Sequence, residues 1–312
     1  MYRFVHVTEL SAVRDKKPTF LAIGVFDGIH RGHQELLARM SAAAQEVGAR
    51  SAALTFDPHP RSVIPNQRIP EYLSTLEERV NLLAEQGIDL VITHPFDDKT
   101  RRTSAKEFVD NLCAYLDLKQ LWGGNFGLGY KREGDLAFLQ NLGEERGYTV
   151  HQFESFLEWK GQPISSSRIR QAVREGRMGD ASALLGRSYR MRGQVIHGDG
   201  RGAVLGIPTA NLAVWEEQVM PKSGVYATYA WVEERRYKAA TNVGTRPTVN
   251  GRNLVIEAHL IGFDGDLYGQ ELLLDFETWI RDEKKFPGLD ELVAQIRADI
   301  ALVRRYLQPA PL

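Results

Sequence analysis

Two histidines lie where an apolar segment gives way to a helical pattern, an arrangement suited to binding phosphate. The segment FLAIGVF (20–26) runs into DGIHRGH (27–33), and an amphipathic pattern follows. A strand followed by a helix would place His30 and His33 at the helix N-terminus, where free N–H groups and the helix dipole attract anions. Such a site could align a phosphate acceptor and stabilise charge on a transferred phosphate. Histidines in an ordinary loop are the plainer alternative.

Three further segments of the N-terminal half carry polar groups suited to a nucleotide or a planar ligand. ISSSRIR (164–170) puts hydroxyls before a helix and two arginines in its first turns. TFDPHP (55–60) is a turn whose His59 could face phosphates, and 125–135 combines an amide, an aromatic ring and a Lys-Arg pair in a Gly-rich loop. A serine cap, a structural turn and a solvated loop are the respective alternatives.

A second group of chemically suited residues lies in the segment 193–212, GQVIHGDGRGAVLGIPTANL. Its glycines precede no helical pattern and no Gly-Lys-Ser/Thr occurs, so neither the dinucleotide fingerprint nor the P-loop applies. The loop amides could still surround phosphates. Thr209 and Asn211 provide hard oxygen atoms that could join ATP phosphates around Mg²⁺.

Phosphorylation of an alcohol also needs a base, because a hydroxyl is a poor nucleophile at neutral pH. Glu257 is the candidate. In LVIEAHLIG (254–262) the alternation puts Glu257 and His259 on one face and Ile256, Ala258 and Leu260 on the other. A barrel mouth could present the carboxylate, although a solvated outer face explains the same alternation.

The elements that must position the first group form an alternating β/α pattern from Thr19 to about Phe153. Strand-like runs (FLAIGVF, SAALTF, DLVIT, KQLWG and YTVHQF) alternate with helical spacings. One helix should follow His33 and end before Gly48, and capping boxes pair Ser74 with Glu77 and Ser104 with Glu107. The pattern predicts a doubly wound α/β domain with a parallel sheet, whose ligands bind beyond the carboxyl ends of the strands.

The second group belongs to a β-rich region from Tyr189 to Phe276, after a short helical stretch at 164–185. GVYATYAWV and YKAATNV flank the tip 233–236 and predict a hairpin in a small antiparallel sheet or barrel. A closing helix should pack on it through an apolar stripe at helical spacing: Leu289, Leu292, Ile296, Ile300, Val303 and Leu307.

Length and composition fit two soluble domains, predicted as 1–186 and 187–312, in a chain of 312 residues. The 39 Lys and Arg nearly balance the 40 Asp and Glu, so no overall field would attract nucleic acid. The single cysteine, Cys113, excludes a disulfide framework and suits a reducing compartment. The apolar run at 20–26 is too short to span a membrane and no signal peptide is recognisable, so we expect a cytoplasmic protein without a membrane partner.

Together these motifs resemble the prokaryotic bifunctional riboflavin kinase/FMN adenylyltransferases, also called FAD synthetases. The resemblance spans nearly the whole chain and rests on GVFDGIHRGH (24–33), TFDPHP, ISSSRIR, GIPTANL (206–212), KSGVYA (222–227), NVGTRPTV (242–249), IEAHL (256–260), DLYGQ (266–270) and RDEKKF (281–286). It implies an α/β nucleotidyltransferase domain of the HxGH superfamily followed by a β-barrel riboflavin kinase domain. Riboflavin, FMN and ATP would be the substrates, with Mg²⁺ as the metal.

The resemblance also implies roles for individual residues. Catalysis would fall to Glu257, His30, His33 and Arg170. ATP would be bound by Gly24, Phe26, Asp27, His30, His33, His59, Ser165, Ser166, Arg170, Gly198, Gly206, Pro208 and Thr209. Flavin would be bound by Asn125, Phe126, Arg281 and Glu283, and Mg²⁺ by Thr209 and Asn211. A homo-oligomer stays an open alternative.

Two departures from the family pattern predict altered affinities. Relatives often carry a Phe-Arg-Phe-Gly type of loop after Asn or Asp, whereas this chain has Asn125, Phe126, Gly127, Leu128 and Gly129. Ala203 replaces a usual Arg and Ile207 a common aromatic residue. The first departure should weaken flavin binding in the N-terminal domain, and the second should alter ATP binding by the kinase. The rival hypotheses are a riboflavin kinase with an inert N-terminal domain and a flavin-sensing regulatory protein.

Overall fold

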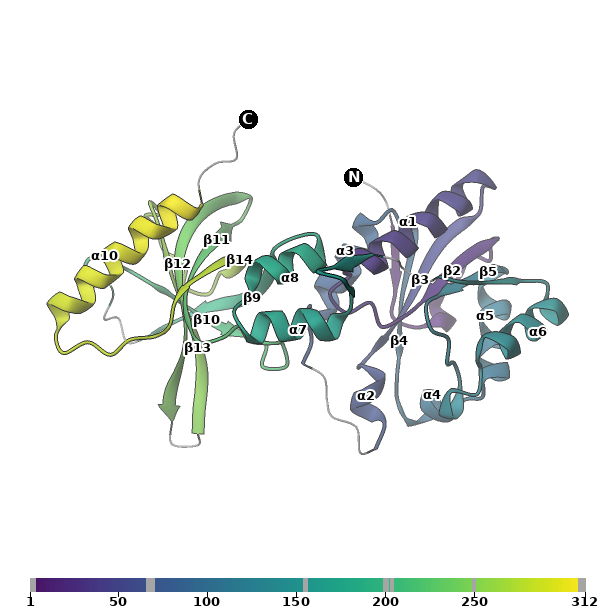
Figure 1. Ribbon diagram of the computed structural model, residues 1–312. Coiled ribbons are helices and arrows are strands. Elements are labelled where there is room, and N and C mark those ends of the chain that lie inside the picture. Colours follow the sequence, from purple (N-terminus) through teal and green to yellow (C-terminus); the bar gives the residue numbers. More distant parts are fainter. Residues whose placement is uncertain are drawn as a thin grey trace. The chain divides into compact units, whose positions relative to one another are not determined.

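The chain forms two compact units, Met1–Ser165 and Ser166–Leu312 (Figure 1). The computed structural model describes residues 4–65, 71–153, 157–198, 202, 205–248 and 251–307. Ala203 lies outside these ranges. The predicted functional boundary between residues 186 and 187 stays a prediction. In the described part of the chain, no helix is long and apolar enough to cross a membrane.

The first unit is built on a sheet of six parallel strands in the order β1-β4-β3-β2-β5-β6. The strands are β1 (Val5–Val7), β2 (Thr19–Ile23), β3 (Arg50–Asp57), β4 (Leu90–Pro95), β5 (Leu118–Gly123) and β6 (Thr149–Gln152). The helices are α1 (Arg31–Glu46), α2 (Pro60–Val63), α3 (Leu76–Glu85), α4 (Asp98–Arg102), α5 (Ala105–Leu116) and α6 (Leu136–Arg146). Short elements complete the unit: the 3₁₀ turns η1 (Leu10–Ala12) and η2 (Tyr130–Arg132), and the strands β7 (Glu158–Trp159) and β8 (Gln162–Pro163).

Alternate residues of the central strands bury opposite faces of this sheet, which confirms the doubly wound architecture. In β2, Leu21 packs with α5 and α6, whereas Phe20 and Ala22 pack with α1 and α3. Successive side chains of a strand point to opposite faces, so a nearly continuous apolar run is required when helices cover both. The predicted helix after His33 is α1, and Gly48 follows it with φ +67°.

The order of the strands identifies where a ligand should bind. The chain passes from β2 to β3 and β4 on one side, and then returns to place β5 on the other side of β2. Ligands of open α/β sheets bind beyond the carboxyl ends of the strands at this kind of reversal. The segments that follow β2 and β5 are the histidine turn and the loop beginning at Gly124.

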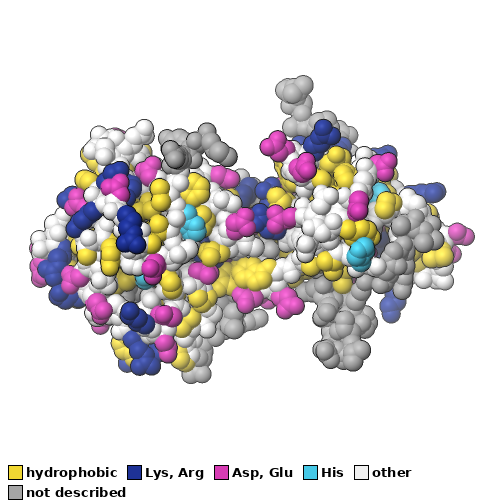
Figure 2. All heavy atoms as spheres, turned by 180° about the vertical axis from the view of Figure 1, so that it is seen from behind, with side chains coloured by type: hydrophobic (Ala, Val, Ile, Leu, Met, Phe, Trp, Pro, Cys, Tyr) yellow, Lys and Arg dark blue, Asp and Glu magenta, His cyan; other side chains and the backbone are white. Residues whose placement is uncertain are grey.

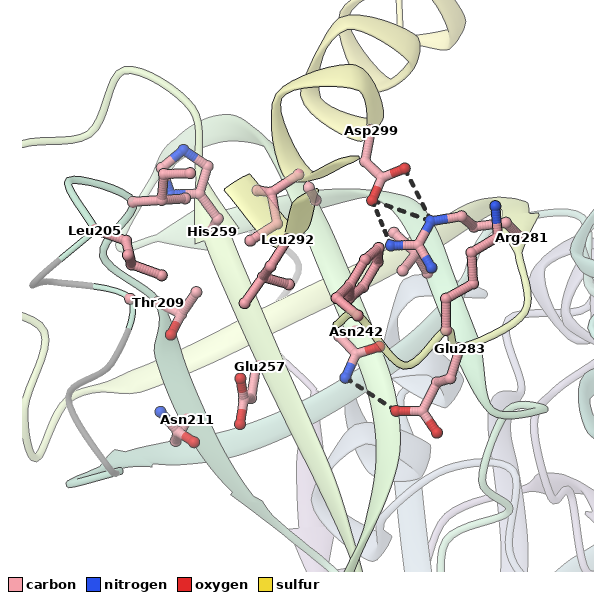
Figure 3. Close-up of a pocket in the computed structure, with 17 residues that line it drawn as sticks. Leu205, Thr209, Asn211, Asn242, Glu257, His259, Arg281, Glu283, Leu292 and Asp299 are labelled. Atoms are coloured by element: carbon pink, nitrogen blue, oxygen red, sulfur yellow. Dashed lines mark hydrogen bonds and ion pairs between the residues drawn. The ribbon is translucent and has the colours of Figure 1, made fainter. Parts of the chain in front are cut away.

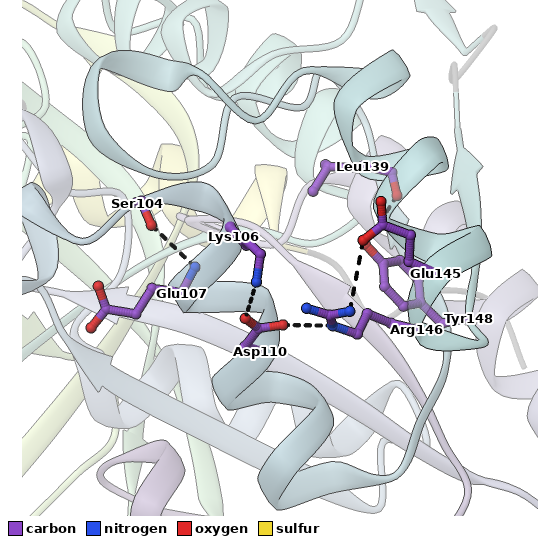
Figure 4. A network of polar contacts seen from close by, with 8 residues as sticks. All are labelled: Ser104, Lys106, Glu107, Asp110, Leu139, Glu145, Arg146 and Tyr148. Carbon is purple, nitrogen blue, oxygen red and sulfur yellow. Dashed lines mark hydrogen bonds and ion pairs between the residues drawn. The ribbon is translucent and has the colours of Figure 1, made fainter.

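A polar network on the surface ties α5 to α6 (Figure 4). Asp110 accepts hydrogen bonds of 2.8 Å from both Lys106 and Arg146. Beneath it, the hydroxyl of the buried Tyr148 donates to the carbonyl of Leu139 at 2.9 Å. The exposed ion pairs contribute little to stability compared with the apolar contacts under α5 and α6.

One of the two predicted capping boxes is displaced by a residue. Ser104 caps α5 as expected, by accepting a hydrogen bond from the backbone N–H of Glu107. The cap of α3 is Thr75 rather than Ser74, because the Ser74 hydroxyl instead accepts a hydrogen bond from the backbone N–H of Gly28. The sequence pattern could not predict this hydrogen bond, because its donor lies 46 positions earlier in the chain.

The second unit contains the predicted closed antiparallel barrel, in the order β10-β13-β12-β11-β14-β9 with β9 next to β10. Its strands are β9 (Tyr189–Ile196), β10 (Ala210–Val214), β11 (Gly224–Val232), β12 (Arg235–Thr248), β13 (Gly251–Leu260) and β14 (Glu271–Arg281). The helices are α7 (Ser166–Arg174), α8 (Met178–Leu185) and α10 (Leu289–Tyr306). The expected hairpin is β11–β12, which turns at Glu233 and Glu234.

The closing helix α10 packs on the outside of the barrel through Val303 and Leu307, which meet Ala227 and Ala240. Leu289, expected to be on the packed face, is 65% exposed because it is the first residue of the helix. Another contact was not foreseen: Asp299 of α10 is buried and receives three hydrogen bonds from Arg281 of β14. This ion pair fixes the helix to the barrel wall.

Candidate active sites

The histidine turn of the first unit has the predicted strand–turn–helix geometry. His30 is the N-cap of α1, and its Nδ1 accepts a hydrogen bond of 3.3 Å from the backbone N–H of His33. The two imidazole rings stack with their centroids 3.7 Å apart. Phe26 and Ile29 have positive φ angles of 50° and 35°, a rare conformation for non-glycine residues that is typical of functional sites.

The environment of His33 favours its neutral form. Burial lowers the pKa of His33 well below its ordinary value, and the neighbouring His30 lowers it further. His30 Nδ1 must be unprotonated because it accepts a backbone N–H, so a neutral His30 carries its proton on Nε2. In that tautomer Nε2 is the donor nitrogen of the ring.

Two residues of the predicted ATP site shape the turn. The buried carboxylate of Asp27 accepts hydrogen bonds from the backbone N–H groups of Leu73 and Ser74. Gly24 faces the ring of Phe26, 3.0 Å from the place where a Cβ would stand. In these positions Asp27 and Phe26 hold the histidine turn in place, so a direct role for them in binding ATP stays a prediction.

A cavity of about 660 Å³ lies at the carboxyl edge of the same sheet. It is lined by residues that follow β2, β3, β4 and β5, among them Gly24, His59, Asn125 and Phe126. The predicted nucleotide turn and the predicted flavin loop therefore share one cavity at the strand reversal. Phe126 is largely buried and also belongs to the core, whereas Asn125 is exposed to the cavity.

The other residues predicted to bind ATP with the histidine turn lie in three places. His59 is the N-cap of α2 and accepts a hydrogen bond from the backbone N–H of Arg61 at 3.0 Å. Ser165 is the last residue of the first unit, and Ser166 and Arg170 lie in α7 of the second unit. Because α7 begins at Ser166, two of the three serines are inside the helix rather than before it. Their grouping with His30 and His33 stays a prediction.

The second unit brings the predicted kinase residues together in one row. Glu257 of β13 is the direct partner of Asn211 in β10 and of Asn242 in β12. Opposed residues of neighbouring strands share a face, so the three side chains lie side by side across three strands, as Figure 3 shows. They line a cavity of about 380 Å³ together with Thr209 and His259.

This cavity is on the outer wall of the barrel rather than at its mouth. Ile256, Ala258 and Leu260 are buried, and Glu257 alternates with them, so its carboxylate faces the other way. Residues of 281–286 and α10 line the cavity on that outer face. Glu257 thus lies on the outer face, as one alternative drawn from the sequence had it, but half-buried in a covered cavity rather than in open solvent or at a barrel mouth.

The donors near Thr209 fit a hard cation bound with nucleotide phosphates. The Oδ1 atom of Asn211 is buried and no hydrogen bond to it is found among the described residues, so an acceptor oxygen is free for a ligand. Thr209 adds a hydroxyl oxygen. The described residues contain no cluster of three or more His, Cys, Asp and Glu that could hold a metal alone. Mg²⁺ would therefore be held jointly by these oxygens and by phosphate.

The glycine-rich segment packs directly on these donors. A Cβ at Gly198 would lie only 2.5 Å from Cγ of Asn211, and one at Gly202 would lie 3.2 Å from Oγ1 of Thr209. Gly206 has φ +72°, and the carbonyl of Pro208, two residues further on, accepts a hydrogen bond of 2.8 Å from Nδ1 of His259. Of the predicted ATP-binding residues, Gly198 thus packs on Asn211 and Pro208 precedes Thr209 in the chain.

The side of the cavity predicted to bind flavin is held by polar contacts of the wall itself. The guanidinium of Arg281 is engaged by Asp299, and Glu283 accepts a hydrogen bond of 3.4 Å from Asn242 (Figure 3). Leu292 and Ile296 of α10 and Phe286 provide apolar surface for a planar ring. Contact of Arg281 and Glu283 with flavin stays a prediction.

The structure adds residues for which the sequence suggested no role. Asn242 lies in NVGTRPTV, a motif that carried the family resemblance, yet only the strand register shows that it faces Glu257. The charged groups of the first cavity come from three elements: Arg61 from α2, Arg101 from α4, and Lys131 and Arg132 from η2. Among these, only the Lys-Arg pair had a sequence signal.

Comparisons with known protein families give a match to each half of the chain. A family model described as FAD synthetase matches residues 12–168. A second model, described as riboflavin kinase, matches residues 185–307. The two matches coincide with the two groups of motifs and with the cavities described above.

Two curated relatives span nearly the whole chain. A protein of Escherichia coli (strain K12) is 37% identical over 92% of this chain and 92% of its own length. One of Bacillus subtilis (strain 168) is 32% identical over 97% of each. Both are named bifunctional riboflavin kinase/FMN adenylyltransferase.

A solved structure shares the fold along the chain. It is described as a macrolide-efflux protein from Streptococcus pneumoniae and has a TM-score of 0.88 at 28% sequence identity. The match covers 97% of this chain and 99% of that one. Efflux is the role given to that protein alone. The curated relatives are named for two transferase activities.

Proposed function

This chain belongs to the family of bifunctional riboflavin kinase/FMN adenylyltransferases, and on this premise we propose that it makes both FMN and FAD. The barrel phosphorylates riboflavin with ATP, and the α/β domain, predicted to include α7, transfers AMP from a second ATP to FMN, releasing pyrophosphate. The observation that carries the proposal is the row of Asn211, Glu257 and Asn242 beside Thr209 in one cavity.

In the kinase step, Glu257 accepts the proton of the 5′-hydroxyl of riboflavin as that oxygen attacks the γ-phosphate of ATP. FMN and ADP result. Thr209 and Asn211 would hold Mg²⁺, which neutralises phosphate charge when it is bound. Asn242 beside Glu257 is placed to orient the hydroxyl, and the apolar surface of Phe286, Leu292 and Ile296 to receive the flavin ring.

In the adenylyl transfer, the phosphate of FMN is already a nucleophile and needs no base. It attacks the α-phosphate of ATP, and pyrophosphate leaves. Nε2 of His30 donates a hydrogen bond to the phosphates, and His33 lies against the same ring. The roles of Ser165, Ser166 and Arg170 at this step are part of the proposal, supported by the motif ISSSRIR.

The alternative of a kinase with an inert N-terminal domain has less support. The FAD synthetase model matches that domain, and the strained histidine turn has the strand–turn–helix geometry.

A cytoplasmic location is also part of the proposal, because one cysteine and ATP as a substrate suit that compartment.

The test follows riboflavin, FMN and FAD by chromatography after addition of Mg-ATP. The wild-type protein should convert riboflavin to FAD through FMN. Glu257→Gln should stop FMN formation but convert supplied FMN to FAD, whereas His33→Ala should do the reverse. A wild-type protein that stops at FMN, or a folded single variant that loses both activities, would refute the assignment.

A further inference from the structure

The cavity of the first unit carries an excess of positive charge that the histidine turn does not explain. Its lining includes Arg61, Arg101, Lys131 and Arg132, and no carboxylate among the residues that the structure describes. Aromatic residues form other parts of the same wall, among them Phe56, Phe96 and Phe126. A ligand that combines a flat apolar ring with an anionic group matches such a lining.

Arg132 stands out because its guanidinium packs on the backbone of Gly127. A Cβ at residue 127 would lie 2.6 Å from Nε, 2.8 Å from Nη2 and 2.9 Å from Cζ of Arg132. These distances are shorter than a van der Waals contact, so any side chain at 127 would displace the guanidinium. Gly127 follows Asn125 and Phe126, the residues predicted to bind flavin.

The backbone that presents Arg132 is strained and tightly held. Lys131 and Arg132 have φ angles of 51° and 65°, although neither is glycine. The loop is closed by two hydrogen bonds between Leu128 and Gly134, of 2.9 and 3.1 Å. Strain of this kind costs about 1–3 kcal/mol per residue and persists where the surroundings impose it, often at a ligand site.

The positive charge of Arg132 is not neutralised within the described ranges. Its neighbour Glu133 is engaged elsewhere, by the backbone N–H of Ala105 at 2.8 Å. Arg101, by contrast, is paired with Asp98 at 2.9 Å. Arg132 has no ion pair in the described part of the chain.

We propose that Arg132 binds the phosphate group of FMN in the first unit, and that residue 127 is glycine because a side chain there would displace this guanidinium. The inference rests on the proposed function and goes beyond it by assigning a phosphate-binding residue. It also revises the expectation that the loop after Asn125 binds flavin more weakly for lack of an arginine. Position 127 has no arginine, but the guanidinium of Arg132 lies against Gly127, next to Phe126 in the chain.

The test measures FAD formation from supplied FMN. Arg132→Gln should raise the KM for FMN about 10–100-fold, the usual effect of losing a hydrogen bond to a charged group, with a smaller change in kcat. Lumiflavin has the flavin ring but no phosphate, so its inhibition constant Ki should be the same for Arg132→Gln and for the wild type. Phosphorylation of riboflavin should be unchanged, and Arg132→Lys should restore part of the affinity. Arg102→Gln, on the exposed side of α4, is the control for loss of one positive charge.

Gly127→Ala provides the second test, because the backbone at 127 does not have a positive φ and accepts alanine. The methyl group should displace Arg132 and raise the KM for FMN to a similar degree. Both changes remove the same contact, that of Arg132 with the phosphate. The KM for FMN of the double variant should therefore be no higher than that of Arg132→Gln alone.

Three outcomes would overturn the inference while the wild type still makes FAD: an unchanged KM for FMN in Arg132→Gln, an equal loss of lumiflavin inhibition, or additive effects in the double variant. A wild type that makes no FAD would instead refute the proposed function.

Discussion

The packing of the histidine turn favours the neutral form of His33. Burial and the stacked His30 lower the pKa of His33, and His30 uses Nδ1 as an acceptor within the turn. Incoming phosphates therefore meet a neutral ring at His33 rather than a buried imidazolium.

This environment predicts a pH dependence of stability. The folded pKa of His33 is below the unfolded value of about 6.5, so the unfolded state binds more protons and stability falls as the pH drops below 6.5. The loss can reach at most about 1.4 kcal/mol per pH unit. Thermal unfolding of the wild type and of His33→Gln at pH 7.5 and 5.5 should show a weaker pH dependence in the variant. Parallel profiles would contradict the prediction.

A second prediction concerns the contact between Gly198 and Asn211. In Gly198→Ala the new methyl group would displace the Asn211 amide, so kcat/KM of the kinase should fall about 10–100-fold, as when a group that orients a metal ligand is lost. Adenylylation of FMN should not change. Gly179→Ala is the matched control, because its Cβ would meet nothing within 4 Å. Equal effects of the two changes would contradict the prediction.

The sequence alone could predict Thr209, Asn211 and Glu257, because their chemistry is visible in short motifs. It could not predict Asn242 or the place of Arg132. The first depends on the register between β12 and β13, and the second on a contact between two turns of one loop.

Among the elements, α10 is the one whose position decides the shape of the kinase cavity. Leu292 and Ile296 line that cavity, and the bond between Arg281 and Asp299 fixes the helix. A buried ion pair thus holds the helix in addition to the apolar contacts of Val303 and Leu307.

Removal of one partner should be costly. Asp299→Ala would leave the guanidinium of Arg281 unpaired and should lower the free energy of unfolding by about 3–5 kcal/mol, with a higher KM for riboflavin. The double variant Arg281→Met with Asp299→Leu should recover stability. Denaturant unfolding and kinase kinetics provide the two measurements. If the stable double variant also recovers its KM, the predicted contact of Arg281 with flavin is wrong.

Most elements could be predicted from periodicity, because both faces of the parallel sheet and one face of the barrel are buried. β1 was missed because its three residues, Val5 to Val7, show too little alternation to recognise. The displaced cap of α3 was missed for another reason, since Ser74 is recruited by Gly28 across the fold.

At the scale of the molecule, the charges are dispersed. Figure 2 shows Lys and Arg side chains interspersed with Asp and Glu over the face in view. This agrees with a net charge of −1 and with small anionic substrates bound in local pockets rather than along an extended basic surface.

Each unit has its own cavity, which predicts that the two steps can be divided between molecules. A mixture of Glu257→Gln and His33→Ala proteins should convert riboflavin to FAD with Mg-ATP, because FMN released by one protein is a substrate for the other. Chromatography of the products over time provides the measurement. Absence of FAD from the mixture, when each variant retains its own step, would contradict this independence.

The edges of the sheets affect how readily the protein aggregates in concentrated solution. The barrel is closed, and the six-stranded sheet ends on β1 and β6, which are only three and four residues long. An unpaired edge strand is a template for strands of other chains, and a very short edge strand blunts this tendency. Among the described elements, aggregation by strand addition is therefore disfavoured by closure in one unit and by short edges in the other.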